Sequence, residues 1–235
     1  MAETRGDKKG MAGAYNNIGT VYLEQKQEEQ ALQYMNKALA LFKEIDDKKW
    51  IHNTYTNIGN IYTDLGRLDE AMTNYQTALR IRQELNDQKG ISASYNNIGL
   101  VYQQQGDYNK AIENMQLALE LAVAAKYKGG MANAYYNIAM SKLALHQLKE
   151  VTPLIEKSMA LCKEMNNPDG IKECYFGLAA ADSAQGNFRQ ALANYKQYIV
   201  YKDSLVNVAN TKKIMQQQLQ YEFDKKELEL KMAQD

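Results

Sequence analysis

Residues 86–106 read NDQKGISASYNNIGLVYQQQG, and versions of this stretch recur along the chain. Residues 46–66 read DDKKWIHNTYTNIGNIYTDLG, residues 6–26 read GDKKGMAGAYNNIGTVYLEQK, and residues 126–146 read KYKGGMANAYYNIAMSKLALH. A fifth, weaker copy occupies residues 167–186. One tyrosine marks the same place in each copy, at intervals of forty residues: Tyr15, Tyr55, Tyr95, Tyr135 and Tyr175. A fixed period of this size predicts a stack of repeated supersecondary units.

Each unit carries the pattern of two helices. Tyr95, Ile98, Gly99 and Tyr102 follow the spacing i, i+3, i+4, i+7 of one helix face, and a second amphipathic segment begins after Gly106. The sequence therefore predicts an all-α, right-handed superhelix of five helix-turn-helix repeats, followed by a long C-terminal helix.

Glycine recurs inside the first helix of three units, at Gly19, Gly59 and Gly99. A glycine inside a helix costs about 1 kcal/mol relative to alanine, so we expect another helix to cross there too closely for a side chain. Small partners on the second helices are Ala31, Ala71 and Ala111.

Composition excludes several functions. Lys plus Arg and Asp plus Glu both number 28, so no basic excess points to nucleic acid. No run reaches the roughly 18–20 apolar residues that a membrane span needs, and we expect no membrane contact within this sequence. The two cysteines, Cys162 and Cys174, form no CxxC motif and are expected to be half-buried packing residues.

The pattern Tyr-x-x-Ile-Gly-x-x-Tyr, followed by Gly and then Ala, resembles the tetratricopeptide repeat (TPR). The resemblance covers residues 11–206, and the forty-residue unit is longer than the usual repeat of about 34. That longer form resembles the repeats of kinesin light chains and of bacterial signalling proteins. Residues 3–10 align with Lys43 to Trp50, the end of a second helix, so we interpret residues 1–10 as the end of a preceding repeat or as a tail.

The period is lost in residues 207–235, which contain no Pro or Gly and favour a helix. KDSL at 202–205 and KKIMQQQLQYEFDKKE at 212–227 resemble the segment that joins a TPR array to the membrane span of bacterial sensor histidine kinases. The resemblance implies a projecting helix, a candidate coiled-coil linker, in a longer natural chain.

No catalytic or metal-binding constellation is apparent, and we expect no cofactor, no metal and no enzymatic activity. The only histidines, His52 and His146, lie in different repeats without a metal-ligand spacing; we expect His52 exposed at a helix start and His146 in a turn. Arg82 and other cations of the second helices are interpreted as solvated surface. Pro153 predicts that the second helix of the fourth repeat begins late, near Thr152, or is kinked.

Asparagine is the polar residue that recurs with the period. In the TPR fold the first helix of each unit lines the concave groove, and the resemblance places asparagines in it. The candidate ligand-binding residues are Asn17, Asn57, Asn97 and Asn137, with Asn16, Asn60 and Asn96 nearby. A primary amide can donate to a peptide C=O and accept from its N–H. The alternative is that these amides bond to neighbouring helices and stiffen the stack.

These observations indicate a non-catalytic protein- or peptide-binding module, the sensory or scaffolding region of a bacterial signalling protein of the two-component type. The first alternative is a self-associating spacer, in which two copies form a homodimer through the groove or the C-terminal helix. A further alternative resembles the aspartyl-phosphate phosphatases that act on response regulators. That mechanism needs a separate helical bundle, which the sequence does not show.

Overall fold

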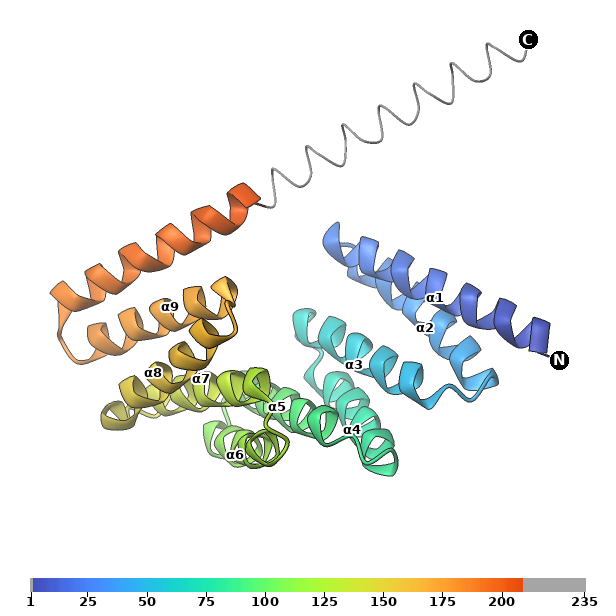
Figure 1. Ribbon diagram of the computed structural model, residues 1–235, viewed down its shortest axis with the longest axis horizontal. Coiled ribbons are helices and arrows are strands. Elements are labelled where there is room, and N and C mark those ends of the chain that lie inside the picture. The colour runs from blue at the N-terminus through green and yellow to red at the C-terminus, as the bar shows by residue number, and fades with distance from the viewer. Residues whose placement is uncertain (1, 209–235) are drawn as a thin grey trace, which may run out of the picture. The chain divides into compact units, whose positions relative to one another are not determined.

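The computed structural model describes residues 2–208, and every regular element in that range is an α-helix. The helices are α1 (Ala2–Glu24), α2 (Glu28–Glu44), α3 (Lys48–Asp64), α4 (Leu68–Glu84), α5 (Gln88–Gln104), α6 (Tyr108–Ala124), α7 (Lys128–Ala144), α8 (Leu148–Glu164), α9 (Pro168–Ala184) and a helix over 188–208. The described part thus holds five helix pairs, as predicted (Figure 1). The chain divides into two compact units between Leu161 and Cys162.

The turns between helices are as regular as the repeats. Helices α2 to α9 each span 17 residues, and the residue two positions after each helix end has a positive φ. These residues are Lys26, Asp46, Gly66, Asn86, Gly106, Lys126, His146, Asn166 and Gly186. At the turn after α3, the Gly66 N–H donates to the Thr63 carbonyl and the Arg67 N–H to the Tyr62 carbonyl. This is the Schellman arrangement, which satisfies the last carbonyls of the helix.

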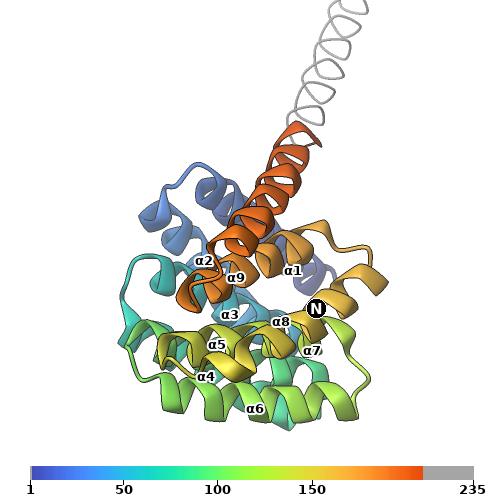
Figure 2. The same cartoon turned by 90° about the vertical axis from the view of Figure 1, so that its left-hand side faces the viewer.

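In the first unit the two helices of a pair lie in different layers. Both views place α3 and α5 above α4 and α6 (Figures 1 and 2). The close crossings predicted from the glycines are present. A Cβ on Gly99 would lie 2.8 Å from Met115 Cγ and 3.1 Å from the Ala111 carbonyl oxygen, so α5 and α6 leave no room for a side chain there.

The notch between the helices of each pair is filled by the first helix of the next pair. Leu32, Leu39 and Phe42 of α2 form one core with Ile58 and Ile61 of α3. The α3/α4 notch, at Ala71 and Tyr75, receives Ile98 and Val101 of α5. The α5/α6 notch, at Ala111 and Met115, receives Ile138 of α7. The three interior contacts of the first unit therefore repeat one design.

In the second unit, α9 pairs with the helix over 188–208. Asn194 donates a hydrogen bond to Asp182 (Nδ2 to Oδ2, 2.8 Å), and the rings of Phe176 and Tyr198 pack with centroids 5.4 Å apart. Leu192, in the second helix of this pair, is 56% exposed. The pair thus has an apolar surface that no described residue covers.

Three local expectations differ from the structure. Helix α1 is continuous from Ala2, so residues 2–10 contain no turn like the one at Asp46 and Asp47. Helix α8 begins at Leu148 and contains Pro153, so the late start near Thr152 was wrong. Cys162 and Cys174 are buried, not half-buried, because α9 comes so close at Gly170 that a Cβ there would overlap the Cys162 sulfur.

The helix that follows α9 continues through Val208, and the remainder of the predicted C-terminal helix, residues 209–235, lies outside the described residues. Among the described helices, none is both long and apolar enough for a membrane span.

The crossing at Gly99 generates a stability prediction. Gly99→Leu should lower the free energy of unfolding by about 1–3 kcal/mol, because the added side chain overpacks the crossing and pushes Met115 and the α6 backbone away from α5. Urea denaturation of the variant and the parent chain measures the difference. The control Arg80→Ala changes an exposed side chain of α4 and should have little effect; an unchanged midpoint for Gly99→Leu would contradict the close crossing.

Candidate functional site

The candidate asparagines occupy equivalent positions on successive first helices. Asn17 lies on α1, Asn57 on α3, Asn97 on α5 and Asn137 on α7. Asn17 is exposed and the other three are half-buried. Their environments nevertheless differ, and the structure divides them into bonded and unbonded amides.

Asn96 and Asn137 are brought together between neighbouring first helices. The Asn137 Nδ2 donates to the Asn96 Oδ1 at 3.1 Å, and α5 and α7 are in contact. Asn96 is also among the buried polar residues. This bond is the stack-stiffening role that was the alternative to ligand binding.

Asn60 has a structural partner within its own repeat. Its Oδ1 accepts a hydrogen bond of 2.7 Å from the Tyr75 hydroxyl, which also lies 3.1 Å from the Thr63 hydroxyl. Burial raises the pKa of Tyr75, so this phenol stays protonated and available as a donor.

The remaining asparagines are not engaged in this way. Within residues 2–208, the side chains of Asn17, Asn57 and Asn97 have no hydrogen-bond partner, and the buried Oδ1 of Asn16 also lacks one. Asn16 and Asn57 stand in the same relation, 41 residues apart, as Asn96 and Asn137. The amides of Asn16 and Asn57 are therefore unpaired, although the equivalent amides of Asn96 and Asn137 form a hydrogen bond between α5 and α7.

The repeated tyrosines serve packing. Tyr15, Tyr55 and Tyr135 are half-buried, and a lysine of a second helix lies over each ring: Lys37 Nζ is 5.8 Å from the Tyr15 centroid, Lys43 Nζ 5.1 Å from Tyr55 and Lys157 Nζ 5.4 Å from Tyr135. Such cation–π contacts hold first and second helices together.

A polar cluster that the sequence did not predict lies among α3, α4 and α5. His52 is 5% exposed and Arg82 is 7% exposed, so the expectations of an exposed His52 and a solvated Arg82 were wrong. Arg82 Nη1 donates to the Ser94 hydroxyl at 2.7 Å and to the Gly90 carbonyl at 3.3 Å. Burial, and then the Arg82 charge, lower the pKa of His52, while Asp87 acts in the opposite direction. His146 lies in a turn, as expected.

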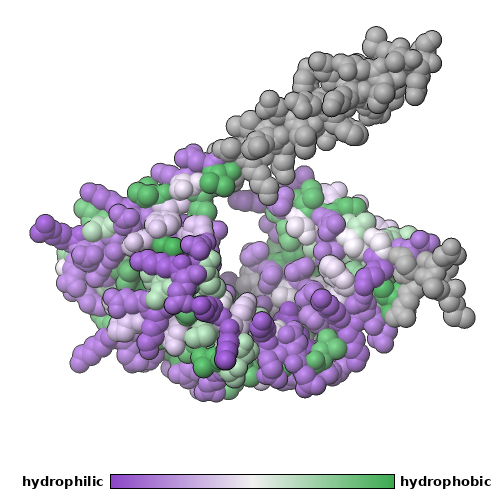
Figure 3. All heavy atoms as spheres, in the orientation of Figure 1, coloured by the Kyte–Doolittle hydropathy of each residue, from purple (hydrophilic) through white to green (hydrophobic). Residues whose placement is uncertain are grey.

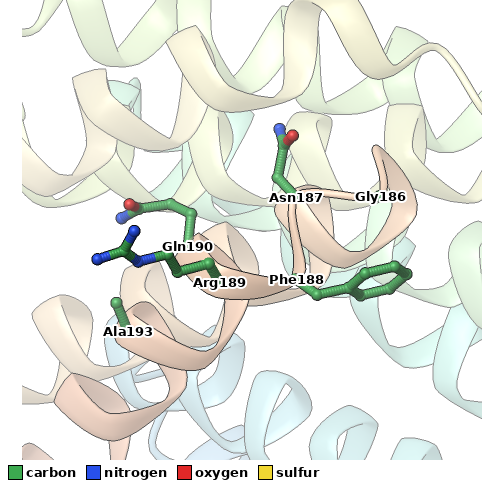
Figure 4. Close-up of a pocket in the computed structure, with 6 residues that line it drawn as sticks. All are labelled: Gly186, Asn187, Phe188, Arg189, Gln190 and Ala193. Carbon is green, nitrogen blue, oxygen red and sulfur yellow. The ribbon is translucent and has the colours of Figure 1, made fainter.

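The described part of the chain shows no metal centre. No three His, Cys, Asp or Glu side chains within residues 2–208 gather in a way that could hold a metal ion. A shallow hollow of about 530 Å³ lies at the start of the helix over 188–208. Arg189 and Gln190 project on one side of it and Phe188 on the other (Figure 4), without a nucleophile or a general base.

Comparison with known proteins identifies the repeats. A family model described as "Tetratricopeptide repeat" matches residues 10–84, 50–122 and 130–199. The chain therefore belongs to the tetratricopeptide repeat family, a class of protein-binding modules. Among curated proteins, no relative matches the sequence.

Solved structures with the same fold include proteins of several kinds. BtubC (BKLC) from P. vanneervenii is 17% identical, with a TM-score of 0.69 and coverage of 84% of this chain and 82% of that one. Aspartyl phosphate phosphatase F from Bacillus subtilis is 16% identical, with a TM-score of 0.68 and coverage of 83% of this chain but only 60% of that one. A Rap protein complexed with Competence and Sporulation Factor is 15% identical, with a TM-score of 0.65 and coverage of 85% and 66%. At these identities the likeness establishes the fold.

The buried His52 generates a pH prediction. Its pKa is lowered in the folded protein, so the unfolded chain binds the proton first as the pH falls below about 6.5. Folding stability should therefore decrease in that range. His52→Ala should reduce the loss because it removes the titrating group, and the variant should fold because alanine occupies this position in the first and fourth repeats.

Urea midpoints at about pH 7.5 and about pH 5.5, on either side of the ordinary histidine pKa, measure the effect. The matched variant His146→Asn changes the exposed turn histidine to a residue that tolerates positive φ and should keep the parent pH dependence. Equal pH dependence in the parent chain and His52→Ala would contradict this assignment.

Proposed function

We propose that the protein is a non-catalytic module that binds an extended segment of a partner protein across the first helices α1, α3 and α5. The binding residues are Asn16, Asn17, Asn57 and Asn97. The amides of Asn57 and Asn97 would donate to and accept from the partner's main chain, so that they hold an extended peptide irrespective of its side chains.

The observation that carries this proposal is the buried, unpartnered Oδ1 of Asn16, together with the unengaged amides of Asn57 and Asn97. A buried acceptor without a hydrogen bond costs about 1–3 kcal/mol, and a turn of the half-buried Asn16 side chain toward a peptide N–H would remove that cost. Between α5 and α7, by contrast, Asn137 donates to Asn96, and these two amides are bonded within the protein.

The wider role proposed is that of a sensory or scaffolding region in bacterial signalling. Similarity to a Rap protein complexed with Competence and Sporulation Factor supports the binding of a signalling factor by a fold of this kind, and the C-terminal sequence resembles a sensor-kinase linker. Similarity to aspartyl phosphate phosphatase F extends to the fold alone. The described residues offer no cluster that would serve phosphate hydrolysis.

A double substitution tests the peptide site. A random-peptide phage library panned on the parent chain supplies the probe, and the best peptide is then titrated by calorimetry. Asn57→Ala with Asn97→Ala should weaken its binding about fivefold or more, since two neutral hydrogen bonds contribute about 1–3 kcal/mol. The melting temperature should hardly change, because neither side chain bonds to the protein.

The control variant, Asn36→Ala with Asn114→Ala, removes two asparagines from the second helices α2 and α6 and should bind the peptide as the parent does. Asn137→Ala, which leaves the buried Asn96 without its donor, should instead lower the melting temperature. If the Asn57/Asn97 variant melts earlier and binds normally, those amides are structural and the proposal fails.

A further inference from the structure

The two ends of the array carry opposite halves of the interior contact between repeats. Inside the first unit, each notch between a first and a second helix receives apolar side chains from the next first helix. We propose that the open notch at the end of one copy receives α1 of a second copy, so that copies stack head to tail.

The inserting half of this contact is exposed on α1. Ile58 and Ile61 of α3 are 2% and 0% exposed, and both lie in the core formed with α2. Their equivalents on α1, forty residues earlier, are Ile18 and Val21, which are 39% and 49% exposed. Met11, on the same stripe, is also exposed, whereas its equivalents Ile51 and Ile91 are buried. Helix α1 therefore presents the apolar stripe that its counterparts bury.

The receiving half, in the second unit, is not covered by any of residues 162–208. A groove of about 400 Å³ runs between α9 and the helix over 188–208. Its lining residues are Phe176, Ala179, Ala180, Ser183, Ala191, Leu192 and Tyr195. Ala191 is equivalent to Ala111, and Tyr195 to Met115, the two residues that meet Ile138 of α7 in the interior. The groove is thus the same notch without its inserted helix.

The sequence that follows the groove lacks the residues with which the next repeat would fill it. The turn position that follows the last helix would be residue 206, which is a valine and lies within the helix over 188–208. A β-branched residue strongly disfavours positive φ. One repeat further on, the positions of Ile58 and Ile61 correspond to Gln218 and Tyr221, so this segment lacks the aliphatic pair that α1 carries.

The predicted contact joins two different surfaces, so it does not close on itself in a dimer. A heterologous contact of this type builds closed rings where the rotation between copies closes and open chains where it does not. The face drawn in Figure 3 is mainly hydrophilic, with hydrophobic residues scattered over it.

Sedimentation equilibrium over a concentration series tests the proposal with the full chain. The average mass of the parent should grow steadily with concentration and pass that of a dimer. Val21→Glu removes the inserting face and Leu192→Glu blocks the notch, and each variant alone should remain monomeric. Both side chains are about half exposed, so the fold should persist; Met11→Glu replaces Val21→Glu if that variant fails to fold.

Mixing the two variants identifies the geometry. Each retains one intact end, so an equimolar mixture should form a 1:1 dimer and grow no further. Leu117→Glu alters an equally exposed apolar residue of α6 and should associate like the parent. A dissociation constant of about 1 mM corresponds to a binding free energy of only about 4 kcal/mol. A parent chain that stays monomeric up to about 1 mM therefore overturns the proposal, and it does so even if residues 209–235 are what fills the notch. Association that survives Val21→Glu but not Leu192→Glu would also overturn it, in favour of notch-to-notch pairing.

Discussion

The structure depends on a backbone reversal that recurs every twenty residues. Each reversal places one residue in the left-handed region, where an L-residue other than glycine costs roughly 1–2 kcal/mol. Glycine, asparagine, aspartate and histidine, which tolerate this region, hold most of these positions. Because helices α2 to α9 have the same length, successive reversals within each compact unit return the chain at the same height. The next reversal would fall at Val206, which instead lies within the helix over 188–208, so the repeat does not continue there.

Close approach at the first-helix glycines is the second requirement, and the fold meets it with different partners. The space above Gly59 is taken by the Tyr75 ring and that above Gly99 by Met115. In the fourth repeat Ala139 replaces the glycine and is completely buried, so that crossing accommodates a methyl group. The second-helix residue facing this position can therefore vary in shape, provided that the helices remain close.

Periodicity predicted the helices, their pairing and the glycine crossings, because each depends on residues that recur. The environments of His52 and Arg82 depend on residues that do not. The polarity of His52 and Arg82 led to the prediction that both side chains are exposed. The residues equivalent to Arg82 in the first and third repeats, however, are Phe42 and Ala122, and both are buried. The repeat register held the correct signal, and the Arg82 charge is accommodated by a hydrogen bond to the Ser94 hydroxyl, whose equivalents in the other repeats are Ala14, Thr54, Ala134 and Cys174. The pairing of Asn137 with Asn96 likewise required knowing which residue stands opposite.

Stacking and recognition make separate demands on the same first helix. In α3, α5 and α7 a neighbouring pair covers the positions of Ile58 and Ile61, and these positions are apolar except for the buried Ser141. The position of Asn16 is free of that demand, and its equivalents change from Thr56 and Asn96 to Tyr136 and Phe176. Peptide amides suit the polar members of this series, whereas the aromatic members suit apolar side chains. Within the first unit, from Thr56 and Asn96 to Tyr136, a partner segment with a polar part and an apolar part would therefore match the order of the repeats in one direction only.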